Sequence, residues 1–413
     1  MGAMLTSTVT APCNVFGHCG GCATQDLSYA EQLARKQAQL QTWFASWQAV
    51  VQPIIPCGDP WRYRNRMDYV FGSGDGGALQ LGQHRKGFFN QTVNVDDCWL
   101  QSEAANQARN LTRDFFAQRS YAAYHPRTHQ GLLRYLIVRQ SASTGGLMLN
   151  LVLADRSALA SADLEAWTSK LRAAVPDLAS IYITEQAAKA DTAFSTDVQL
   201  CWGEKILTET IPLEATKCGA AATANRQFAI DNLQFNISPM AFFQTNTLQA
   251  RRLYAEILKA AQLSGCETVL DLYCGTGTIA QLLAPQARWV YGVEYVAAAI
   301  ADAKANAALN NISNATFLTD KVESWLKWNG PELDADLWVL DPPRAGLHPK
   351  ILRKRLPELE QKPRRILYVS CAPQRLAEDL PLLAADYHVE SLLPVDMFPH
   401  TPHAEVLAVL SRC

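Results

Sequence analysis

The sequence lacks several features that would assign it to whole classes of protein. No run of about 18 apolar residues occurs, so no transmembrane helix is indicated. The first residues contain no basic segment followed by an apolar one, so we expect no signal peptide and a cytoplasmic location. Basic residues are not in excess, since the chain has 37 Lys and Arg and 39 Asp and Glu. The formal net charge of -2 excludes a uniformly basic nucleic-acid-binding surface and leaves room for a local basic patch.

What is present is a chain long and apolar enough for two or three domains. Its 413 residues are 48% hydrophobic and 18% charged, which is typical of a globular protein with a sizeable core. Up to about residue 238, short strands alternate with a few helices, which predicts an α+β, mainly antiparallel domain. Ser28 with Glu31 has the spacing of a capping box at the start of the first helix. The expected helices cover residues 28–48, 101–118 and 161–174, and the expected strands cover 62–71, 79–83, 133–140 and 147–153.

The pattern changes after Pro239, where strands and helices alternate regularly. Such alternation predicts a parallel sheet with helices on both faces, an α/β Rossmann-like domain. We therefore divide the chain into a first domain, residues 1–238, and a second, residues 239–413. The expected helices of the second domain cover 248–261 and 297–309, and its expected strands cover 268–273, 289–294, 337–341, 366–370, 387–395 and 404–410.

A glycine-rich turn in the second domain indicates a nucleoside-containing cofactor. Gly275 and Gly277 follow a strand that ends near Asp271, and they allow the backbone to approach a ligand closely. Glu294 ends the next strand, where a carboxylate can hold two ribose hydroxyls. The turn nearly satisfies the dinucleotide pattern. Further acids at successive strand ends, Asp320 and Asp341, instead resemble the layout of S-adenosylmethionine-dependent methyltransferases.

A candidate nucleophile and a candidate base lie further along the chain. Cys371 follows an apolar strand and precedes a helix that begins near Pro373, so we expect the helix N-terminus to lower the pKa of its thiol. Glu405 begins the last strand, among His400 and His403, and could act as a general base if it is desolvated.

Together these two residues suit one particular reaction. Carbon 5 of uracil is a poor nucleophile, but addition of a thiolate to carbon 6 places negative charge on carbon 5. That carbon can then accept a methyl group, and a base must afterwards remove its proton. The reaction needs one cysteine, one base, S-adenosylmethionine and a target base taken out of the stack.

A second cysteine constellation lies near the N-terminus. Cys13, Cys19 and Cys22 have C-x5-C-x2-C spacing, which can place three thiolates on one metal centre. Zinc and an iron–sulfur cluster both remain open, with His18 in favour of zinc. The fourth ligand would come from elsewhere, with Cys98 the first candidate and Cys57 the second.

Taken together, the residues resemble the iron–sulfur RNA (uracil-5-)methyltransferases, over nearly the whole chain. The motifs that carry this resemblance are the Cys13–Cys22 knuckle with Gly20-Gly21, Asp97-Cys98, Phe242-Phe243-Gln244-Thr245-Asn246, residues 271–275, residues 341–346, Ser370-Cys371 and residues 398–405. The chain departs from the family where Ala372-Pro373 stands in place of the usual Asn-Pro.

The resemblance implies a role for each group of residues. Cys371 would be the nucleophile and Glu405 the base. Cys13, Cys19, Cys22 and Cys98 would hold a [4Fe-4S] cluster, with zinc as the alternative. Residues of the cofactor site would be Gln244, Tyr273, Gly275, Glu294, Asp320 and Asp341. The helix at 28–48 would pack on the catalytic domain.

The resemblance also suggests a substrate. The family's small N-terminal RNA-binding barrel has no counterpart before the cysteine knuckle, as in the bacterial members that act on 23S rRNA. We therefore expect methylation of a specific uridine in 23S rRNA, with the T-loop uridine of tRNA as the alternative and a monomer as the default state. A basic strand face at 61–66 and a basic cluster at 350–365, beside the active edge of the sheet, would contact RNA.

Two other functions compete with this one. An amino-group methyltransferase is suggested by Asp341-Pro342-Pro343, but Arg344 stands where that chemistry usually has an aromatic residue. A non-catalytic, cluster-bearing RNA-binding protein would keep the cysteines and basic faces without needing Glu405.

Overall fold

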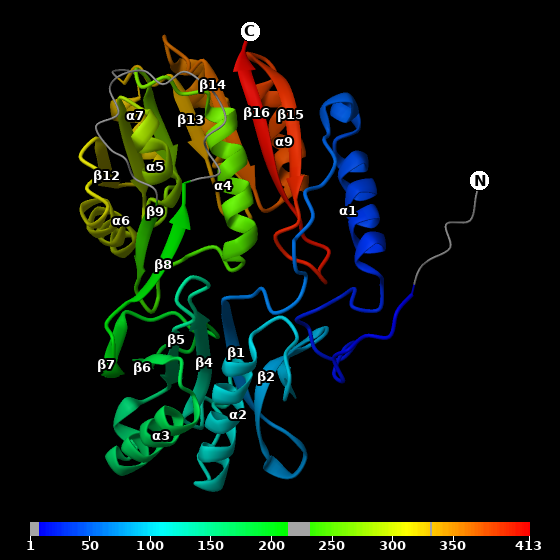
Figure 1. The fold of residues 1–413 in the computed structure, drawn as a ribbon, viewed down its shortest axis with the longest axis vertical. Helices are drawn as coiled ribbons and strands as arrows, with labels where there is room; N and C mark the ends of the chain where they lie inside the picture. Colours follow the sequence, from blue (N-terminus) through cyan, green and yellow to red (C-terminus); the bar gives the residue numbers. More distant parts are fainter. Residues whose placement is uncertain (1–7, 214–231, 331–332) are drawn as a thin grey trace.

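A computed structural model describes residues 8–213, 232–330 and 333–413 of the chain. Two seven-stranded sheets form the framework of these residues, one above the other in the view of Figure 1, with a two-stranded ribbon beside them. The upper sheet belongs to the C-terminal part and the lower sheet to the central part of the chain. No helix of the described residues is long and apolar enough to cross a membrane.

The lower sheet has the order β3-β2-β1-β4-β5-β6-β7. Its neighbours pair antiparallel except β5 and β6, which confirms the prediction of a mainly antiparallel sheet. Helices α2 and α3 pack together, and Trp167 of α3 is fully buried against Phe116 of α2. The elements are β1 (Arg66–Ser73), β2 (Leu79–Arg85), β3 (Phe88–Asn94), α2 (Glu103–Gln118), β4 (Leu133–Gln140), β5 (Leu147–Leu153), α3 (Ser161–Ala174), β6 (Leu178–Glu185) and β7 (Asp197–Gly203).

The upper sheet has the order β12-β11-β10-β13-β14-β16-β15. Strands β10 to β14 are parallel, and β16 runs antiparallel between β14 and β15. Since β16 points away from the lower sheet in Figure 1, the carboxyl ends of the parallel strands face it. The elements are α4 (Thr247–Ala261), β10 (Thr268–Leu272), α5 (Thr278–Leu283), β11 (Trp289–Glu294), α6 (Ala297–Leu309), β12 (Ala315–Thr319), α7 (Val322–Asn329), β13 (Leu337–Leu340), α8 (Leu356–Glu358), β14 (Arg365–Ser370), α9 (Pro373–Leu383), β15 (Tyr387–Val395) and β16 (Glu405–Arg412).

The ribbon of β8 (Leu207–Pro212) and β9 (Asn232–Ile237) packs on the upper sheet although it precedes residue 238. Asn306 and Asn310 of α6 each bond to the backbone of β9 in both directions, at 2.8–3.2 Å. Phe235 is buried in the same core as Val269 of β10. The ribbon lies before residue 238 in the sequence but packs with the second half, so the domain boundary between residues 238 and 239 remains a prediction.

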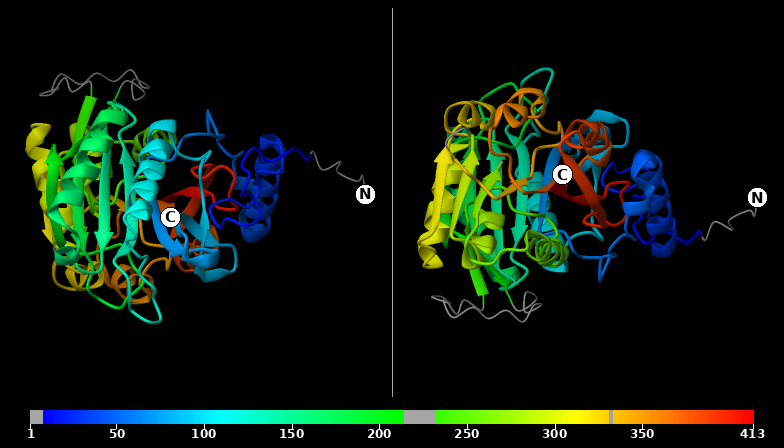
Figure 2. Two further views of the ribbon diagram at one scale, coloured as in Figure 1. Left: turned by 90° about the horizontal axis from the view of Figure 1, so that it is seen from below. Right: turned by 90° about the horizontal axis from the view of Figure 1, so that it is seen from above.

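Helix α1 (Tyr29–Trp43) also packs against the C-terminal half of the chain. Figure 1 and Figure 2 together show it beside β15 and β16, at the height of the upper sheet. The Ser28 side chain accepts from the backbone of Glu31, as the capping pattern predicts, and Leu40 and Phe44 are buried in the core of the upper sheet. Helix α1 thus packs on the upper sheet, although it precedes the lower sheet in the sequence.

A buried ion pair joins α1 to the segment before β16. Lys36 Nζ lies 2.6 Å from Asp396 Oδ1, with relative exposures of 4% and 0%. The Tyr29 hydroxyl donates to the second carboxylate oxygen at 2.8 Å, so both oxygens are satisfied. Removing one partner of such a pair leaves the other charge buried without compensation, which destabilises the fold strongly. An exposed ion pair contributes little to stability.

We therefore expect Lys36→Ala to lower the free energy of unfolding by about 3–5 kcal/mol. The matched control is Arg35→Ala, which removes the exposed Arg35–Glu31 pair on the same helix and should cost less than about 1 kcal/mol. Chemical denaturation of both variants measures the difference. Equal losses would contradict a special role for the buried pair.

Candidate functional site

The strand register brings Cys371 and Glu405 to the same edge of the sheet. Ser370, the last residue of β14, pairs with Val406 of β16. Extending this antiparallel register by one residue places Cys371 opposite Glu405. Asp341 follows β13, the other neighbour of β14, and its amide donates to Leu272 of β10 at 3.3 Å. The sequence-predicted nucleophile and base therefore lie together, beside one of the predicted cofactor carboxylates.

Burial raises the pKa of both side chains. Glu405 is 3% exposed, and its Oε2 has no hydrogen-bond partner among the residues described. Burial, and then the nearby Asp341 carboxylate, raise the pKa of Glu405 to about 8. Burial, followed by Glu405 and Asp341, raises the pKa of the Cys371 thiol to about 11. The expectation that the α9 N-terminus lowers the Cys371 pKa is wrong, because desolvation and two carboxylates outweigh it.

The raised pKa of Glu405 predicts a pH-dependent stability. The folded chain holds this proton up to about pH 8, whereas the ordinary pKa is 4.5. The stabilising contribution is thus complete below pH 4.5 and is lost as pH rises through 8. Glu405→Gln removes this dependence, so its stability relative to wild type should grow by about 1.4 kcal/mol per pH unit between pH 5 and 8. A difference that stays constant across that range, in unfolding at several pH values, would contradict the assignment.

The glycine turn after β10 has the backbone that close ligand approach requires. Tyr273, Gly275 and Gly277 have φ values of 66°, 54° and 74°. A Cβ on Gly277 would lie 2.6 Å from the Phe317 ring, so this position requires glycine. The Tyr273 hydroxyl accepts from the His348 amide at 3.5 Å, which ties the turn to the segment after Asp341.

Glu294 and Asp320 end the next two strands, as the sequence predicted. The Glu294 carboxylate accepts from the amides of Gly275 and Val296 at 3.4 and 2.8 Å. The Asp320 amide donates to the Glu294 carbonyl at 3.0 Å. Both acids are half-buried, so they are accessible to a ligand along the same edge.

Asp271, in β10, places a buried carboxylate near this edge of the sheet. It is fully buried, and neither carboxylate oxygen has a hydrogen-bond partner among the described residues. Burial, and then Asp341, raise its pKa well above the ordinary range, and burial raises the pKa of Asp341 to about 7. Unpartnered acceptors in this position fit S-adenosylmethionine, whose hydroxyls and ammonium group are donors and whose sulfonium is a cation.

Gln244, a predicted cofactor residue, lies in the loop before α4 and is buried. Asn65 donates to the Gln244 carbonyl at 2.8 Å and to the Thr247 hydroxyl at 2.6 Å, so the lower sheet holds this loop in place. Asn246 caps α4 and also donates to the Met397 carbonyl at 3.1 Å. Nothing in the local sequence around Asn65 indicates this docking role, since its partners are about 180 residues away.

The four predicted cysteine ligands surround one pocket. It is lined by Cys13, Cys19, Cys22 and Cys98, with Gln25 and Gln83 among the other lining residues. Cys57 lies elsewhere, 3.5 Å from the Asn246 amide, so Cys98 is the better fourth candidate. Two donors point at the sulfurs, the Gly21 amide at 3.4 Å from Cys19 and the Gln25 amide at 3.1 Å from Cys22.

The predicted cysteine site does not form a metal site as the chain is described. In the part of the chain that the structure describes, no three His, Cys, Asp or Glu side chains are arranged to hold one. Burial raises the pKa of Cys19 to about 11 and that of Cys22 to about 12, so both are thiols at neutral pH until a cation binds.

A hydrogen-bonded link connects the cysteine knuckle to the segment before Glu405. The Ala23 amide donates to the His400 carbonyl at 2.8 Å, and the His400 amide donates to Gln32 Oε1 at 2.9 Å. Trp61 stacks on the His400 ring with centroids 3.7 Å apart. Burial lowers the pKa of His400 to about 4, so it is neutral at physiological pH. The sequence analysis missed this link because its members come from three distant segments.

Both predicted basic patches need correction. Strand β1 begins at Arg66, and Arg62 has a φ of 52°, so residues 62–65 do not form the expected strand face. Arg62 pairs with Asp97 at 2.7 Å and Arg66 with Asp68 at 2.9 Å, which leaves only Arg64 of the three without an ion pair among the described residues.

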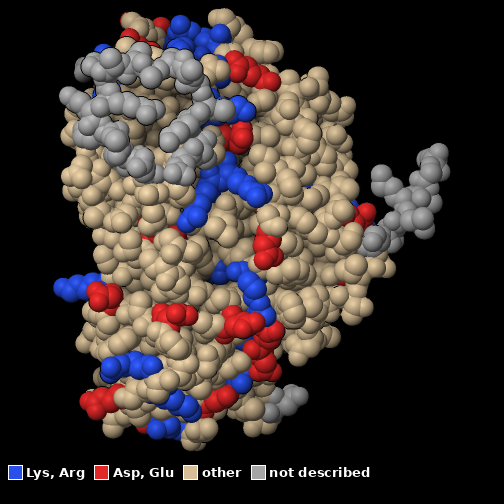
Figure 3. Space-filling view, viewed as in Figure 1, with Lys and Arg blue, Asp and Glu red and all other residues tan. Residues whose placement is uncertain are grey.

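The cluster at 350–365 is also partly misplaced. Arg365 begins β14 and Cys371 follows its end, so about 20 Å of strand separates them. Arg364 and Arg365 therefore lie at the opposite edge of the sheet, where they pair with Glu267 and Glu390. Figure 3 shows basic side chains at several heights of this face, including mid-height, with acidic side chains beside many of them.

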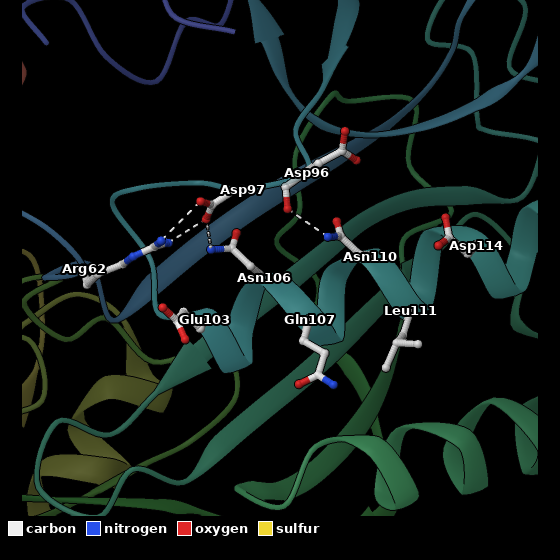
Figure 4. Close-up of a pocket in the computed structure, with 9 residues that line it drawn as sticks. All are labelled: Arg62, Asp96, Asp97, Glu103, Asn106, Gln107, Asn110, Leu111 and Asp114. Atoms are coloured by element: carbon white, nitrogen blue, oxygen red, sulfur yellow. Dashed lines mark hydrogen bonds and ion pairs between the residues drawn. The ribbon is translucent and has the colours of Figure 1, made fainter. Parts of the chain in front are cut away.

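A surface cavity of about 460 Å³ lies apart from this site. Figure 4 shows that it is formed mainly by one side of α2, with Asp97 held by Arg62 and Asn106. Of the residues predicted for catalysis, cofactor or metal, none lines it: its lining is Arg62, Asp96, Asp97, Glu103, Asn106, Gln107, Asn110, Leu111 and Asp114. Its acidic lining does not suit a phosphate-rich ligand.

Comparison with known proteins agrees with the site. Residues 224–413 match the tRNA (uracil-5-)-methyltransferase family. Uncharacterized RNA methyltransferases of Halalkalibacterium halodurans and Caldanaerobacter subterraneus are each 34% identical, over 97% and 98% of this chain and 83% and 85% of their own lengths. The structure is similar to that of Pyrococcus abyssi tRNA (uracil-54, C5)-methyltransferase bound to S-adenosyl-L-homocysteine. Its TM-score is 0.74 and its identity 28%, over 95% of this chain and 84% of that one. The chain therefore belongs to the S-adenosylmethionine-dependent RNA uracil-5-methyltransferase family.

Proposed function

We propose that the protein methylates carbon 5 of a specific uridine in structured RNA. The observation that carries this proposal is the placement of Cys371 directly across the strand register from the buried Glu405, beside the acids of the cofactor edge. An amino-group methyltransferase needs neither residue. S-Adenosylmethionine supplies the electrophilic methyl group, and the chain supplies the nucleophile and the base.

In the proposed reaction, the Cys371 thiolate adds to carbon 6 of a flipped-out uracil and leaves an enolate. Carbon 5 takes the methyl group. The Glu405 carboxylate then removes the proton from carbon 5, the electron pair re-forms the C5–C6 double bond, and Cys371 leaves as thiolate. The thiol must lose its proton before the attack, since its raised pKa keeps it protonated at rest. Glu405 must be ionised at the last step, which its pKa of about 8 allows near neutral pH.

The cofactor site in this proposal runs along the strand ends. Glu294 would hold the ribose, and Asp271, Asp341 and Tyr273 would line the rest, with Gly275 in the turn. Gln244 would reach the reacting edge from the loop before α4, and Asp320 would lie at the outer end. Residues 239–413 would form the catalytic domain, and most of residues 1–238 would form the RNA-binding domain.

Two RNA substrates remain in competition. The motif resemblance points to 23S rRNA. The similarity to the Pyrococcus abyssi enzyme, whose name specifies uracil 54 of tRNA, favours tRNA. Methyl transfer to unmodified 23S rRNA and to unmodified tRNA, measured in parallel with labelled cofactor, decides between them. 5-Methyluridine in rRNA alone would support the first choice, and the same product in tRNA alone would replace it. No label in either RNA would overturn the proposed function.

We further infer that the four-cysteine pocket holds a [4Fe-4S] cluster with a structural role. Four cysteines line one pocket, and backbone and amide donors point at two of their sulfurs. Four cysteine ligands leave no open iron position, so we assign the cluster no step in the reaction.

Metal analysis tests this inference. Anaerobically purified protein should be brown and contain about four irons per chain. Cys98→Ala should lose most of this iron, while the control Cys57→Ala should keep it, since Cys57 lies outside the pocket. A colourless protein with one zinc ion would contradict the cluster.

A further inference from the structure

The β2–β3 hairpin carries an exposed aromatic and basic tip that the catalytic site does not use. We define the hairpin tip as residues 84–91. Phe88 and Phe89 begin the edge strand β3 and are 48% and 66% exposed. Two adjacent large apolar side chains at the end of a hairpin form a contiguous exposed patch, whereas a singly exposed apolar side chain is common on protein surfaces.

The positive charge of the hairpin tip favours an anionic partner. Arg85 ends β2 and Lys86 lies in the turn, and residues 84–95 contain no acid. The Arg85 guanidinium lies over the Phe88 ring, 5.3 Å from its centroid, and donates to Gln91 at 3.1 Å. A cation held beside an aromatic face, with amide side chains nearby, suits an anionic chain that also presents flat bases.

The hairpin tip is also anchored on the side of the active site. The Lys86 amide donates to the His18 carbonyl at 2.8 Å, and the Gly20 amide to the His84 carbonyl at 2.9 Å. The same knuckle bonds through Ala23 to His400, five residues before Glu405. The hairpin tip thus extends the surface that begins at the catalytic edge, through the cysteine knuckle.

We propose that the hairpin tip binds unpaired nucleotides of the substrate RNA, with Phe88 and Phe89 stacking on bases and Arg85 and Lys86 contacting phosphates. This rests on the proposed function for the choice of RNA as the substrate. Unpaired nucleotides are favoured over duplex because stacking on a side chain requires bases that are not already stacked in a helix.

Fluorescence anisotropy with a labelled single-stranded RNA of mixed sequence, and with an RNA duplex of equal length, tests the proposal without any methyl transfer. Phe88→Ala/Phe89→Ala should weaken single-strand binding by about tenfold or more and change duplex binding far less. Arg85→Ala/Lys86→Ala should reduce the slope of log affinity against log salt by about 1.4, which a merely structural role would not do.

Trp328→Ala is the matched control, since Trp328 is 69% exposed on α7 and outside every site described above. It should bind RNA like the wild type. All variants should keep the wild-type affinity for S-adenosyl-L-homocysteine in calorimetry. Unchanged RNA binding by the Phe88/Phe89 variant would overturn the proposal, as would a change of oligomeric state on sedimentation, which would assign the tip to self-association. RNA binding without methylation by the wild type would instead overturn the proposed function and leave this inference standing.

Discussion

Cys371→Ala is expected to lower kcat for methyl transfer by at least about 10³-fold, the scale on which removal of a catalytic nucleophile acts. Without the thiolate, carbon 5 of uracil has no negative charge to direct at the methyl donor. Cofactor binding should persist, because the acids of the cofactor edge lie in β10 and β11 or directly after β12 and β13, and none comes from β14. Single-turnover transfer of labelled methyl and calorimetry with S-adenosyl-L-homocysteine measure the two effects separately.

The matched control for this variant is Cys266→Ala. Cys266 is exposed before β10, at the edge of the sheet opposite Cys371, so its loss should leave the rate unchanged. Wild-type activity in Cys371→Ala would refute the covalent mechanism. Equal losses in both variants would assign the effect to general damage to the fold.

Glu405→Gln is expected to accumulate a covalent protein–RNA adduct. The amide can neither ionise nor accept the carbon-5 proton, so the reaction should stop after methyl transfer with Cys371 still bound to carbon 6. Loss of a general base typically costs 10²–10⁴-fold in turnover, and we expect about that reduction here. Denaturing gel electrophoresis with labelled RNA should show the adduct, and mass spectrometry should locate it on Cys371.

The adduct must depend on the nucleophile, so the double variant Cys371→Ala/Glu405→Gln serves as the control and should form none. A Glu405→Gln enzyme that turns over at the wild-type rate would remove Glu405 as the base. An adduct that persists in the double variant would mean that another residue attacks the uracil.

The sequence predicted the elements of the catalytic half closely because their signals are local. The predicted spans of β11, α6 and β15 match the observed ones residue for residue, since apolar runs bounded by turns and caps define them. The pairing of Cys371 with Glu405 depends on β16 running antiparallel to β14, which brings the start of β16 to the carboxyl end of β14. The predicted strand spans alone do not give that direction.

Features that depend on distant contacts could not be predicted in the same way. The basic alternation at 62–66 suggested a strand, but Arg62 instead adopts a left-handed conformation and pairs with Asp97, 35 residues away. The prediction of a lowered pKa for Cys371 was wrong for a related reason. The sequence shows the start of the helix next to Cys371. It does not show that folding buries the thiol and brings the Glu405 and Asp341 carboxylates close to it.

The central claim is that Cys371 and Glu405 together exchange the proton on carbon 5 of a uridine for a methyl group. RNA carrying [5-³H]uridine tests it directly, since each methyl transfer must release one tritium from that carbon. The account predicts tritium release and methyl incorporation in equal amounts at the target uridine, and neither in Cys371→Ala. Methyl incorporation without tritium release would place the methyl group on another atom and contradict the account.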